Sequence, residues 1–352
     1  MTEITTVPWL DAVLPLSVAG GAAGVSAAVL LLAWWIDRQF GEPLTAIHPV
    51  VWMGRFLKVC GDGVVRCSPA PAFVLGALAW CVGAVAVATV AWGLQGLVLW
   101  QVGQALAAAD MLLAALAALL VLLAGWALKC MLSWRMLHDE AGAVETALQQ
   151  SLAAGRERLS WLVSRDTAQL TDSQVRESAI ESLAENLNDS VVAPIFWFVL
   201  LGLPGAAVYR FANTADAMWG YRGTYRGQHW EWAGKWAARA DDVLSWVPAR
   251  VTALLLMAVT RGVRLSAVLA EAQKTPSPNS GWPMAAMALA LGISLGKPGV
   301  YTLNPSGRPP GPDDVAAAQA DAGKAVVLLL IGAVTAIFLA AAMGGSWPGS
   351  RA

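Results

Sequence analysis

Charged residues are scarce in this sequence. Asp, Glu, Lys and Arg make up 13% of its 352 residues, where a soluble domain carries about 25%. The charge-free stretches are residues 12–36, 67–109, 111–128 and 325–350. A membrane-spanning helix needs roughly 20 apolar residues, so the sequence predicts an all-α, polytopic helical membrane protein.

Several functional signatures are also missing. The net charge of −1 leaves no basic footprint for nucleic acid. The four cysteines form no C-x-x-C pair and have no His at metal-ligand spacing, so neither a zinc site nor a disulfide framework is expected. No Walker, Rossmann or nucleophile-elbow motif is present. The first 16 residues lack Lys and Arg, so a cleavable signal peptide is not expected.

Four to six membrane-embedded segments are expected in a single integral membrane domain over residues 1–352. The predicted spans are 17–36, 73–92, 105–128 and 325–342, and the apolar segments 191–209 and 243–260 are interrupted by proline. Lys and Arg gather in 37–70 and 129–324, which predicts that these large connections are cytoplasmic in an inner (cytoplasmic) membrane. That topology requires the two interrupted segments to be re-entrant. If both cross instead, residues 213–216 lie on the opposite side from residues 177–189.

The stretch from 172 to 219 is the centre of the sequence. Glu177, Glu181 and Glu185 recur every four residues, which stacks three carboxylates on one helix face, with Asn188 and Asp189 just beyond. Thr171 and Gln174 predict a capping box at the start of this helix. The carboxylates could form a solvated acidic face, or a Mg²⁺-binding face, since Mg²⁺ prefers oxygen ligands.

Two further polar clusters follow apolar segments. Asp37, Glu42, His48 and Arg55 come after the first span, and His48 precedes a proline, which favours extended backbone. His48 is either a hydrogen-bonded structural residue or part of a phosphate- or carboxylate-binding site.

The second cluster contains Asn213, Thr214, Asp216 and Tyr221. Helix capping would explain one of the first two residues but not Asp216. The later turn S-P-N-S-G-W-P, residues 277–283, is by itself only a rigid loop.

Together these motifs resemble one known family. The matching stretches are D-x-x-x-G-E-P-x-x-x-x-H-P-V-x-W-M-G-R, R-E-S-A-I-E-S-L-A-E-N-L-N-D-S-V-V-A-P, N-T-A-D-A-M-W-G-Y and S-P-N-S-G-W-P-M-A-A-M. They follow the family's order from about residue 34 to residue 295. The chain is identified by this resemblance as a member of the CobD/CbiB family of integral-membrane cobalamin (vitamin B12) biosynthesis proteins, the adenosylcobinamide-phosphate synthases.

The resemblance implies a carbon–nitrogen ligase that uses ATP and Mg²⁺. It would join a propionate carboxylate of (adenosyl)cobyric acid to (R)-1-amino-2-propanol or its phosphate. The implied partners are this corrinoid, the amino alcohol phosphate, membrane lipid and other cobalamin-assembly membrane enzymes.

Site roles follow from the same resemblance. The expected catalytic residues are Glu177, Glu181, Glu185, Asp216 and His48. The expected substrate-binding residues are Arg55, Arg176, Asn188, Asn213, Tyr221 and Asn279. The expected metal ligands are Glu181, Glu185 and Asp189.

The sequence departs from the family in three places and leaves other functions open. Glu42 stands where Asp is more usual, Thr275 where His is common, and residues 301–303 replace a usual Tyr-Gly-Gly. A transporter remains an alternative, and Asp110 and Arg250 are the charges that fit it. A non-catalytic membrane sensor is the third reading. The Trp-rich region 219–246 is expected to anchor at the membrane interface rather than stack on a corrinoid.

Overall fold

The computed structural model describes residues 20–163 and 165–344, and the chain forms two compact units. In the described part, the first unit comprises residues 20–132, 194–241 and 331–344, and the second comprises 133–193 and 242–330. Nearly all regular structure is helical, with only two short antiparallel hairpins. The all-α prediction is confirmed, while the single membrane domain remains a prediction.

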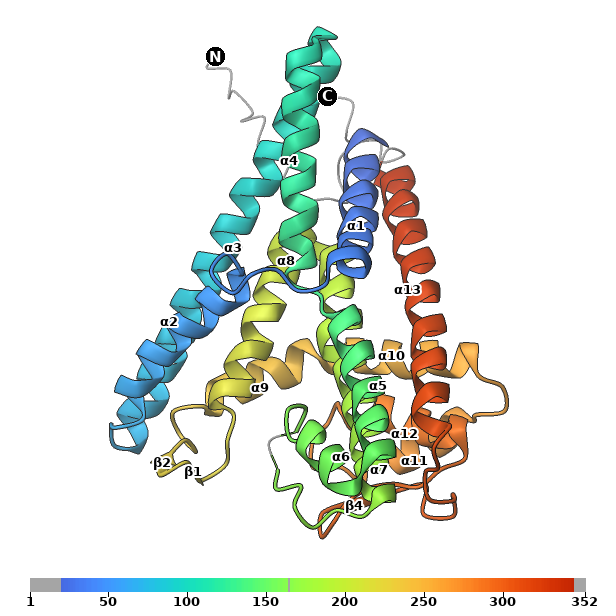
Figure 1. Ribbon diagram of the computed structural model, residues 1–352. Coiled ribbons are helices and arrows are strands. Elements are labelled where there is room, and N and C mark those ends of the chain that lie inside the picture. Colours follow the sequence, from blue (N-terminus) through green and yellow to red (C-terminus); the bar gives the residue numbers. More distant parts are fainter. Residues whose placement is uncertain (1–19, 164, 345–352) are drawn as a thin grey trace. The chain divides into compact units, whose positions relative to one another are not determined.

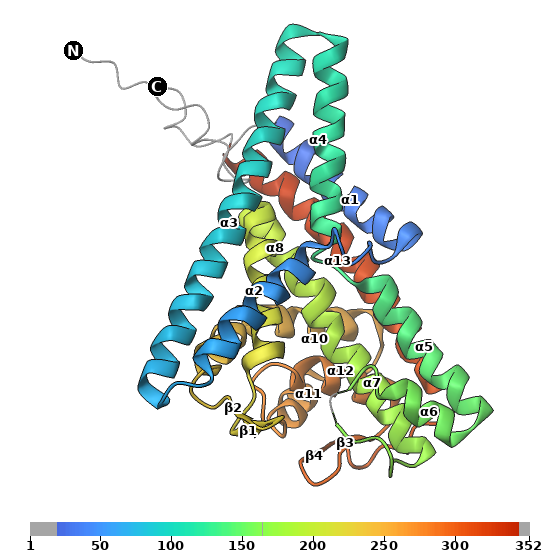
Figure 2. The ribbon, with the colours of Figure 1, turned by 60° about the vertical axis from the view of Figure 1, so that its left-hand side comes forward.

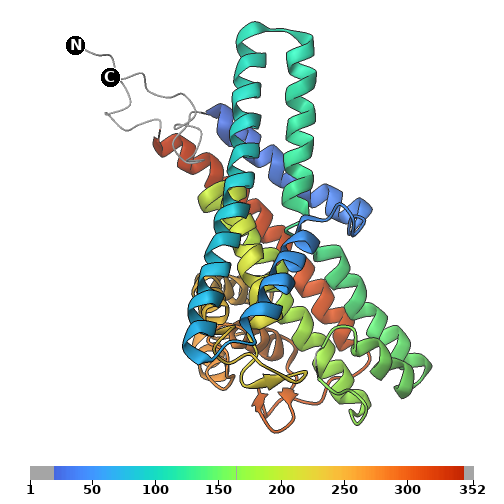
Figure 3. The ribbon, with the colours of Figure 1, turned by 90° about the vertical axis from the view of Figure 1, so that its left-hand side faces the viewer.

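The first unit is built on a helical hairpin. Its elements are α1 (Gly20–Phe40), α2 (Pro49–Val64), α3 (Pro69–Ala108), α4 (Met111–Lys129), α8 (Ala193–Trp219), β1 (Thr224–Tyr225), β2 (Gln228–His229), most of α9 (Lys235–Leu244) and the end of α13 (Asp314–Gly344). Helices α3 and α4 run antiparallel side by side, and α1 packs on α4 (Figure 3). Helix α2 packs on α3.

Helix α3 is much longer than expected. The uncharged link predicted between spans at 93–104 is helical, because the stretch has no proline and its three glycines do not adopt the positive φ of a helix C-cap. Its 40 residues span about 60 Å at 1.5 Å per residue, roughly twice a bilayer's hydrocarbon core. The helix ends at Ala109, which has φ 50°, and the Asp110 carboxylate then caps α4 by accepting from the Leu113 N–H at 2.9 Å.

Helix α8 is interrupted where the sequence predicted a break. Gly202 has φ 69° and ψ −157°, two residues before Pro204. The Leu203 N–H donates instead to Oε1 of Gln95 on α3, at 2.8 Å. Pro194 causes no break: it follows the π-helical residues 188–192, and the helical path from Asp172 to Trp219 continues through it.

Five helical stretches in the described residues are long and apolar enough to cross a membrane: Gly21–Phe40, Pro69–Ala108, Met111–Gln150, Asp172–Trp219 and Asp314–Met343. The pair α9 and α10 (Trp246–Val259), bent by 44°, would make a sixth. The expected four to six embedded segments are confirmed. Whether 191–209 and 243–260 cross or re-enter remains a prediction.

The second unit holds the acidic stretch. Its elements are α5 (Trp134–Gln150), α6 (Leu152–Leu159), α7 (Asp172–Leu187), the π-helical turn η2 (Asn188–Val192), α10, α11 (Leu265–Ala272), α12 (Gly281–Leu291), β3 (Leu295–Lys297), β4 (Tyr301–Leu303) and the start of α13. Helices α5, α6 and α7 lie together (Figure 2). They bury a cluster that includes Val144, Leu148, Leu159 and Val175.

The Trp-rich region is partly core. Trp219 is 2% exposed and Trp230 is 7% exposed, and a side chain at Gly61 would collide with both rings. Interface anchoring is therefore wrong for these two residues, whose surface is used in packing. Trp232 and Trp236 are more exposed, as anchoring requires.

Candidate active site

The predicted site begins with helix α7. Thr171 and Gln174 form the expected reciprocal capping box, with the Gln174 N–H donating to Thr171 Oγ1 and the Thr171 N–H to Gln174 Oε1. Ile180, Leu183 and Leu187 are fully buried, as the apolar stripe requires. The sequence therefore correctly predicts where this helix begins and which of its faces is buried.

The acidic face of α7 is not a solvated surface. Glu181 is only 5% exposed, and Glu177, Glu185 and Asp189 are half-buried. Burying a carboxylate costs free energy unless charge or hydrogen bonds compensate. The neighbours of these side chains therefore decide what this face can do.

The β3–β4 hairpin lies against the acidic face. Glu177 accepts hydrogen bonds from Ser173 Oγ, at 3.3 Å, and from the backbone of Gly296 in β3. Across the hairpin Lys297 pairs with Tyr301, whose hydroxyl donates to Met284 Sδ at 3.7 Å and lies close enough to Glu181 to interact with its carboxylate. Burial and the Glu181 carboxylate raise the pKa of the Tyr301 phenol well above its usual value, so the phenol stays a proton donor.

Two cations also act on Glu181. Nη2 of Arg165 lies 3.2 Å from Glu181 Oε2 and also donates to Ser178 Oγ. Lys297 is exposed and contributes favourable charge at Glu181. The face is thus a mixed patch of carboxylates, cations and a phenol, suited to a polar or anionic ligand rather than to bulk water.

The end of α7 has an irregularity that sequence periodicity did not predict. Residues 188–192 form a π-helical turn, and such turns frequently occur at functional sites. Asn188 is buried, donates to Asp189 Oδ1 at 2.7 Å and accepts from Thr252 Oγ1 at 3.1 Å. The Ser190 carbonyl accepts from the Ser133 N–H. The N-D-S motif is thereby held by α10 and by the start of α5.

A metal held by protein ligands alone does not fit the described residues. Within residues 20–163 and 165–344, no three or more His, Cys, Asp or Glu side chains are grouped to hold a metal ion. Magnesium commonly takes one or two carboxylates and completes its shell with water and substrate phosphates. Glu185 and Asp189, four residues apart and half-buried, fit that smaller role.

Two other predicted residues of this unit already have protein partners. Arg176 forms a two-pronged ion pair with Glu145, at 2.8 and 3.0 Å. Asn279 donates to the Asp242 carbonyl at 2.7 Å and accepts from Arg250 at 2.9 Å. Both side chains therefore stabilise the unit, and their substrate contacts remain predictions.

In the first unit, His48 belongs to a buried charge network. Its Nδ1 accepts from the Val50 N–H and caps α2, and its Nε2 lies 3.0 Å from Glu42 Oε2. Lys129, at the end of α4, contacts Glu42 at 2.8 Å and Asp37 at 3.4 Å. Lys129 and Asp37 are fully buried. The structural interpretation of His48 accounts for all of these contacts.

The remaining predicted residues of the first unit are more accessible. Asn213 donates to Asp241 at 3.4 Å, and Asp216 lies half-buried one turn further along α8. Asn213 and Thr214 lie inside the helix, so the interpretation of one of them as a helix cap is wrong. Tyr221 stacks on Tyr225 with 3.6 Å between ring centroids, and Arg55 is exposed on α2.

The two charges that favoured a transporter have local roles. Asp110 is the N-cap of α4. Arg250 lies between the faces of Trp246 and Trp282 and donates to Asn279 and the Pro278 carbonyl. Neither charge needs a transported ion to explain it.

Sequence reasoning missed Arg165 and Lys297, and it treated Tyr301 only as a departure in a loop. All three come from irregular segments or a short hairpin, so no helical spacing linked them to Glu181. The only available signal was the presence of cations in segments flanking an acidic helix.

Comparison with known proteins agrees with the motifs. The family profile described as "CobD/Cbib protein" matches residues 30–330. This chain belongs to the CobD/CbiB family. A "Cobalamin biosynthesis protein CobD" of Chromobacterium violaceum is 39% identical over 313 residues, covering 86% of this chain and 92% of the relative.

Similar relatives of the CobD/CbiB family occur in archaea. A "Probable cobalamin biosynthesis protein CobD" of Methanothermobacter thermautotrophicus is 38% identical over 286 residues, covering 78% of this chain and 86% of the relative. One of the same description from Thermococcus kodakarensis is 38% identical over 288 residues, covering 82% and 87%. No solved structure matches this chain.

Proposed function

We propose that this protein catalyses amide-bond formation in cobalamin biosynthesis. The propionate carboxylate of (adenosyl)cobyric acid would condense with the amine of (R)-1-amino-2-propanol or its phosphate, giving (adenosyl)cobinamide or its phosphate. Membership of the CobD/CbiB family and the names of its relatives supply the pathway. The buried acidic face of α7, covered by a hairpin carrying a phenol and a cation, is the observation that carries the chemistry.

The reaction needs an activated carboxylate, because an ionised carboxylate does not condense with an amine in water. ATP is the proposed source of activation. Mg²⁺, bound by Glu185 and Asp189 together with nucleotide phosphates, would neutralise phosphate charge. Arg165 and Lys297 would add positive charge for anionic groups of the substrates.

The proton donors and acceptors on the acidic face of α7 fit the proposed reaction. Forming the amide releases a proton from the amine, and a carboxylate such as Glu177 is a suitable acceptor. Tyr301 stays protonated beside Glu181, and Arg165 holds the Glu181 carboxylate in place. The reaction site is proposed to face the cytoplasm, where ATP is available.

The test is amide formation by the purified, detergent-solubilised protein. The assay contains adenosylcobyric acid, aminopropanol phosphate, ATP and Mg²⁺, and the product is detected by its mass. Glu181→Gln is expected to reduce the rate at least about 100-fold, the scale of losing one charge-stabilising group. Glu157→Gln, which changes an exposed carboxylate of the same unit, is the matched control and should leave the rate unchanged.

The outcomes separate three conclusions. Product from the control but not from Glu181→Gln supports both the ligase and the acidic face. Product from all variants would support the ligase activity but would mean that the acidic face of α7 has only a structural role. No product from folded wild-type protein contradicts the ligase and favours the sensor alternative.

A further inference from the structure

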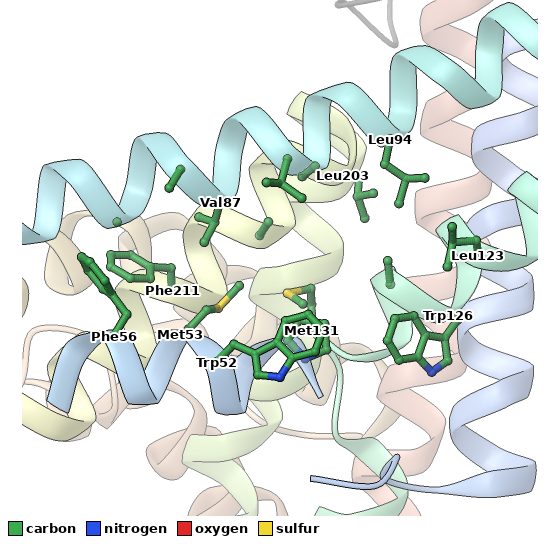
Figure 4. Close-up of a pocket in the computed structure, with 17 residues that line it drawn as sticks. Trp52, Met53, Phe56, Val87, Leu94, Leu123, Trp126, Met131, Leu203 and Phe211 are labelled. Atoms are coloured by element: carbon green, nitrogen blue, oxygen red, sulfur yellow. The ribbon is translucent and has the colours of Figure 1, made fainter. Parts of the chain in front are cut away.

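The first unit contains a large apolar cavity, and none of its lining residues is assigned to the reaction. It measures about 430 Å³, within the range of small-molecule pockets. Its 17 lining residues are all apolar, and in Figure 4 their side chains converge from α2, α3, α8 and the end of α4. A cavity with almost wholly apolar walls disfavours ordered water, so its natural content is hydrocarbon.

The cavity opens outward between membrane-type helices. Val90 on α3 and Leu123 on α4 line it yet remain 75% and 45% exposed. Both helices are long and apolar enough to cross a bilayer. The opening therefore faces lipid acyl chains. An empty cavity would leave the atoms of its walls without dispersion contacts on one side.

Helix α2 supplies the boundary between this cavity and the aqueous phase. It is not one of the candidate spans, and it presents Trp52 and Val59 to the outside together with the exposed cations Arg55 and Lys58. This mixture is typical of a helix lying in the headgroup region. Trp52, Met53 and Phe56 reach into the cavity from the same helix.

A positive charge stands beside the cavity lining. Arg55 follows Trp52 by three residues, so the two are neighbours on the helix surface. Lys58 is paired with Asp62 at 2.8 Å, whereas Arg55 takes part in no ion pair among the described residues. A ligand with an apolar chain and an anionic group is complementary to this combination of cavity and cation.

We propose that this cavity binds one acyl chain of an anionic phospholipid whose phosphate is held by Arg55. The apolar lining selects the chain, and the guanidinium selects the headgroup. Arg55 then ties the protein to its membrane, in place of the substrate-anion role that the motif suggested.

Native mass spectrometry of the full chain in mild detergent tests the proposal. Phosphatidylglycerol and phosphatidylcholine with identical acyl chains are added in turn. Wild-type protein should bind one lipid and prefer phosphatidylglycerol. Val87→Phe, which fills the cavity, should weaken binding of both lipids at least tenfold, or about 1.4 kcal/mol. Arg55→Gln should keep binding but lose the preference.

Controls keep the test decisive. Val85→Phe changes an exposed residue of the same helix outside the cavity and should bind lipid as wild type does. Ala86→Leu is a smaller filling change, for use if Val87→Phe does not fold. Equal loss in Val85→Phe overturns the proposal. Cross-links into the cavity from the chain's own residues 1–19 or from a second copy, with no lipid bound, would also overturn the proposal.

Discussion

The Arg165 guanidinium and the Glu181 carboxylate form an ion pair, with 3.2 Å between Nη2 and Oε2. Glu181 is almost fully buried, whereas Arg165 reaches it from an irregular segment before α7. The acidic face of α7 is therefore held in a defined arrangement by a residue outside the helix. This pair connects the stability of the second unit to its proposed chemistry.

Arg165→Met should destabilise the protein. It leaves a buried carboxylate without its cation, which costs about 1–3 kcal/mol in the free energy of unfolding. Denaturant unfolding in detergent measures the change. Lys324→Met removes an exposed partner of Asp321 and should cost less than about 1 kcal/mol. Equal effects of the two substitutions would mean that the Arg165 pair is solvated.

Thr252→Val tests the π-helical turn. The substitution keeps the shape of the side chain but removes its hydrogen bond to Asn188 Oδ1. We expect a loss of about 1 kcal/mol in stability together with a larger fall in ligase rate, because Asn188 and Asp189 shift. Thr260→Val, whose hydroxyl bonds only to its own helix, should change neither quantity strongly. A lowered stability with an unaltered rate would separate this turn from the reaction.

Lys129→Met should damage the first unit severely. Lys129 is the cation that contacts both Asp37 and Glu42, and its loss removes the shared cation of a fully buried and a half-buried carboxylate. Breaking a buried pair in this way costs about 3–5 kcal/mol, measurable as a large fall in Tm. Lys58→Met removes an exposed helix-surface pair and serves as the control. A Tm close to wild type for Lys129→Met would contradict a buried network.

The Tyr221 phenol should ionise at a higher pH than an ordinary tyrosine. Burial, followed by its hydrogen bond and electrostatic interaction with Tyr225, raises the pKa of Tyr221 to about 12, whereas the unfolded value is about 10. The folded state holds this proton more tightly, so its stabilising contribution is complete below pH ~10 and is lost as pH rises toward about 12. Phenolate absorbance follows the titration.

Two substitutions assign that signal. Tyr221→Phe should remove the component near pH 12. Tyr225→Phe keeps the stacked ring but removes its hydroxyl, so it should lower the pKa of Tyr221 only in part, because burial is the larger cause of the shift. An unchanged late component in Tyr221→Phe would assign it to another phenol, such as Tyr301.

The membrane class and helix α7 could be predicted from the sequence because their signals are local. Charge-free length predicts apolar helices, and Thr171 with Gln174 fixes the start of α7 through contacts three residues apart. The resemblance added the family, since its motifs retain their order along the chain. These predictions need no knowledge of which distant segments meet.

Other features depended on tertiary contacts. The acidic face could have been solvated or buried, and only the packing of β3–β4 on α7 decides that it is buried. The uncharged link at 93–104 contains three glycines that could have ended a helix, but the helix continues through them. Arg176 seemed available for a substrate until Glu145, 31 residues earlier, proved to be its partner.

The break in α8 is completed by a side chain from another helix. At Gly202 the helix loses its own hydrogen bonding, and the Leu203 N–H is satisfied by Gln95, 108 residues earlier on α3. An unpaired N–H in an apolar environment costs several kcal/mol, so the broken geometry of α8 depends on a side chain of α3. The two helices are thus coupled at this point, and a change at Gln95 is felt at Gly202.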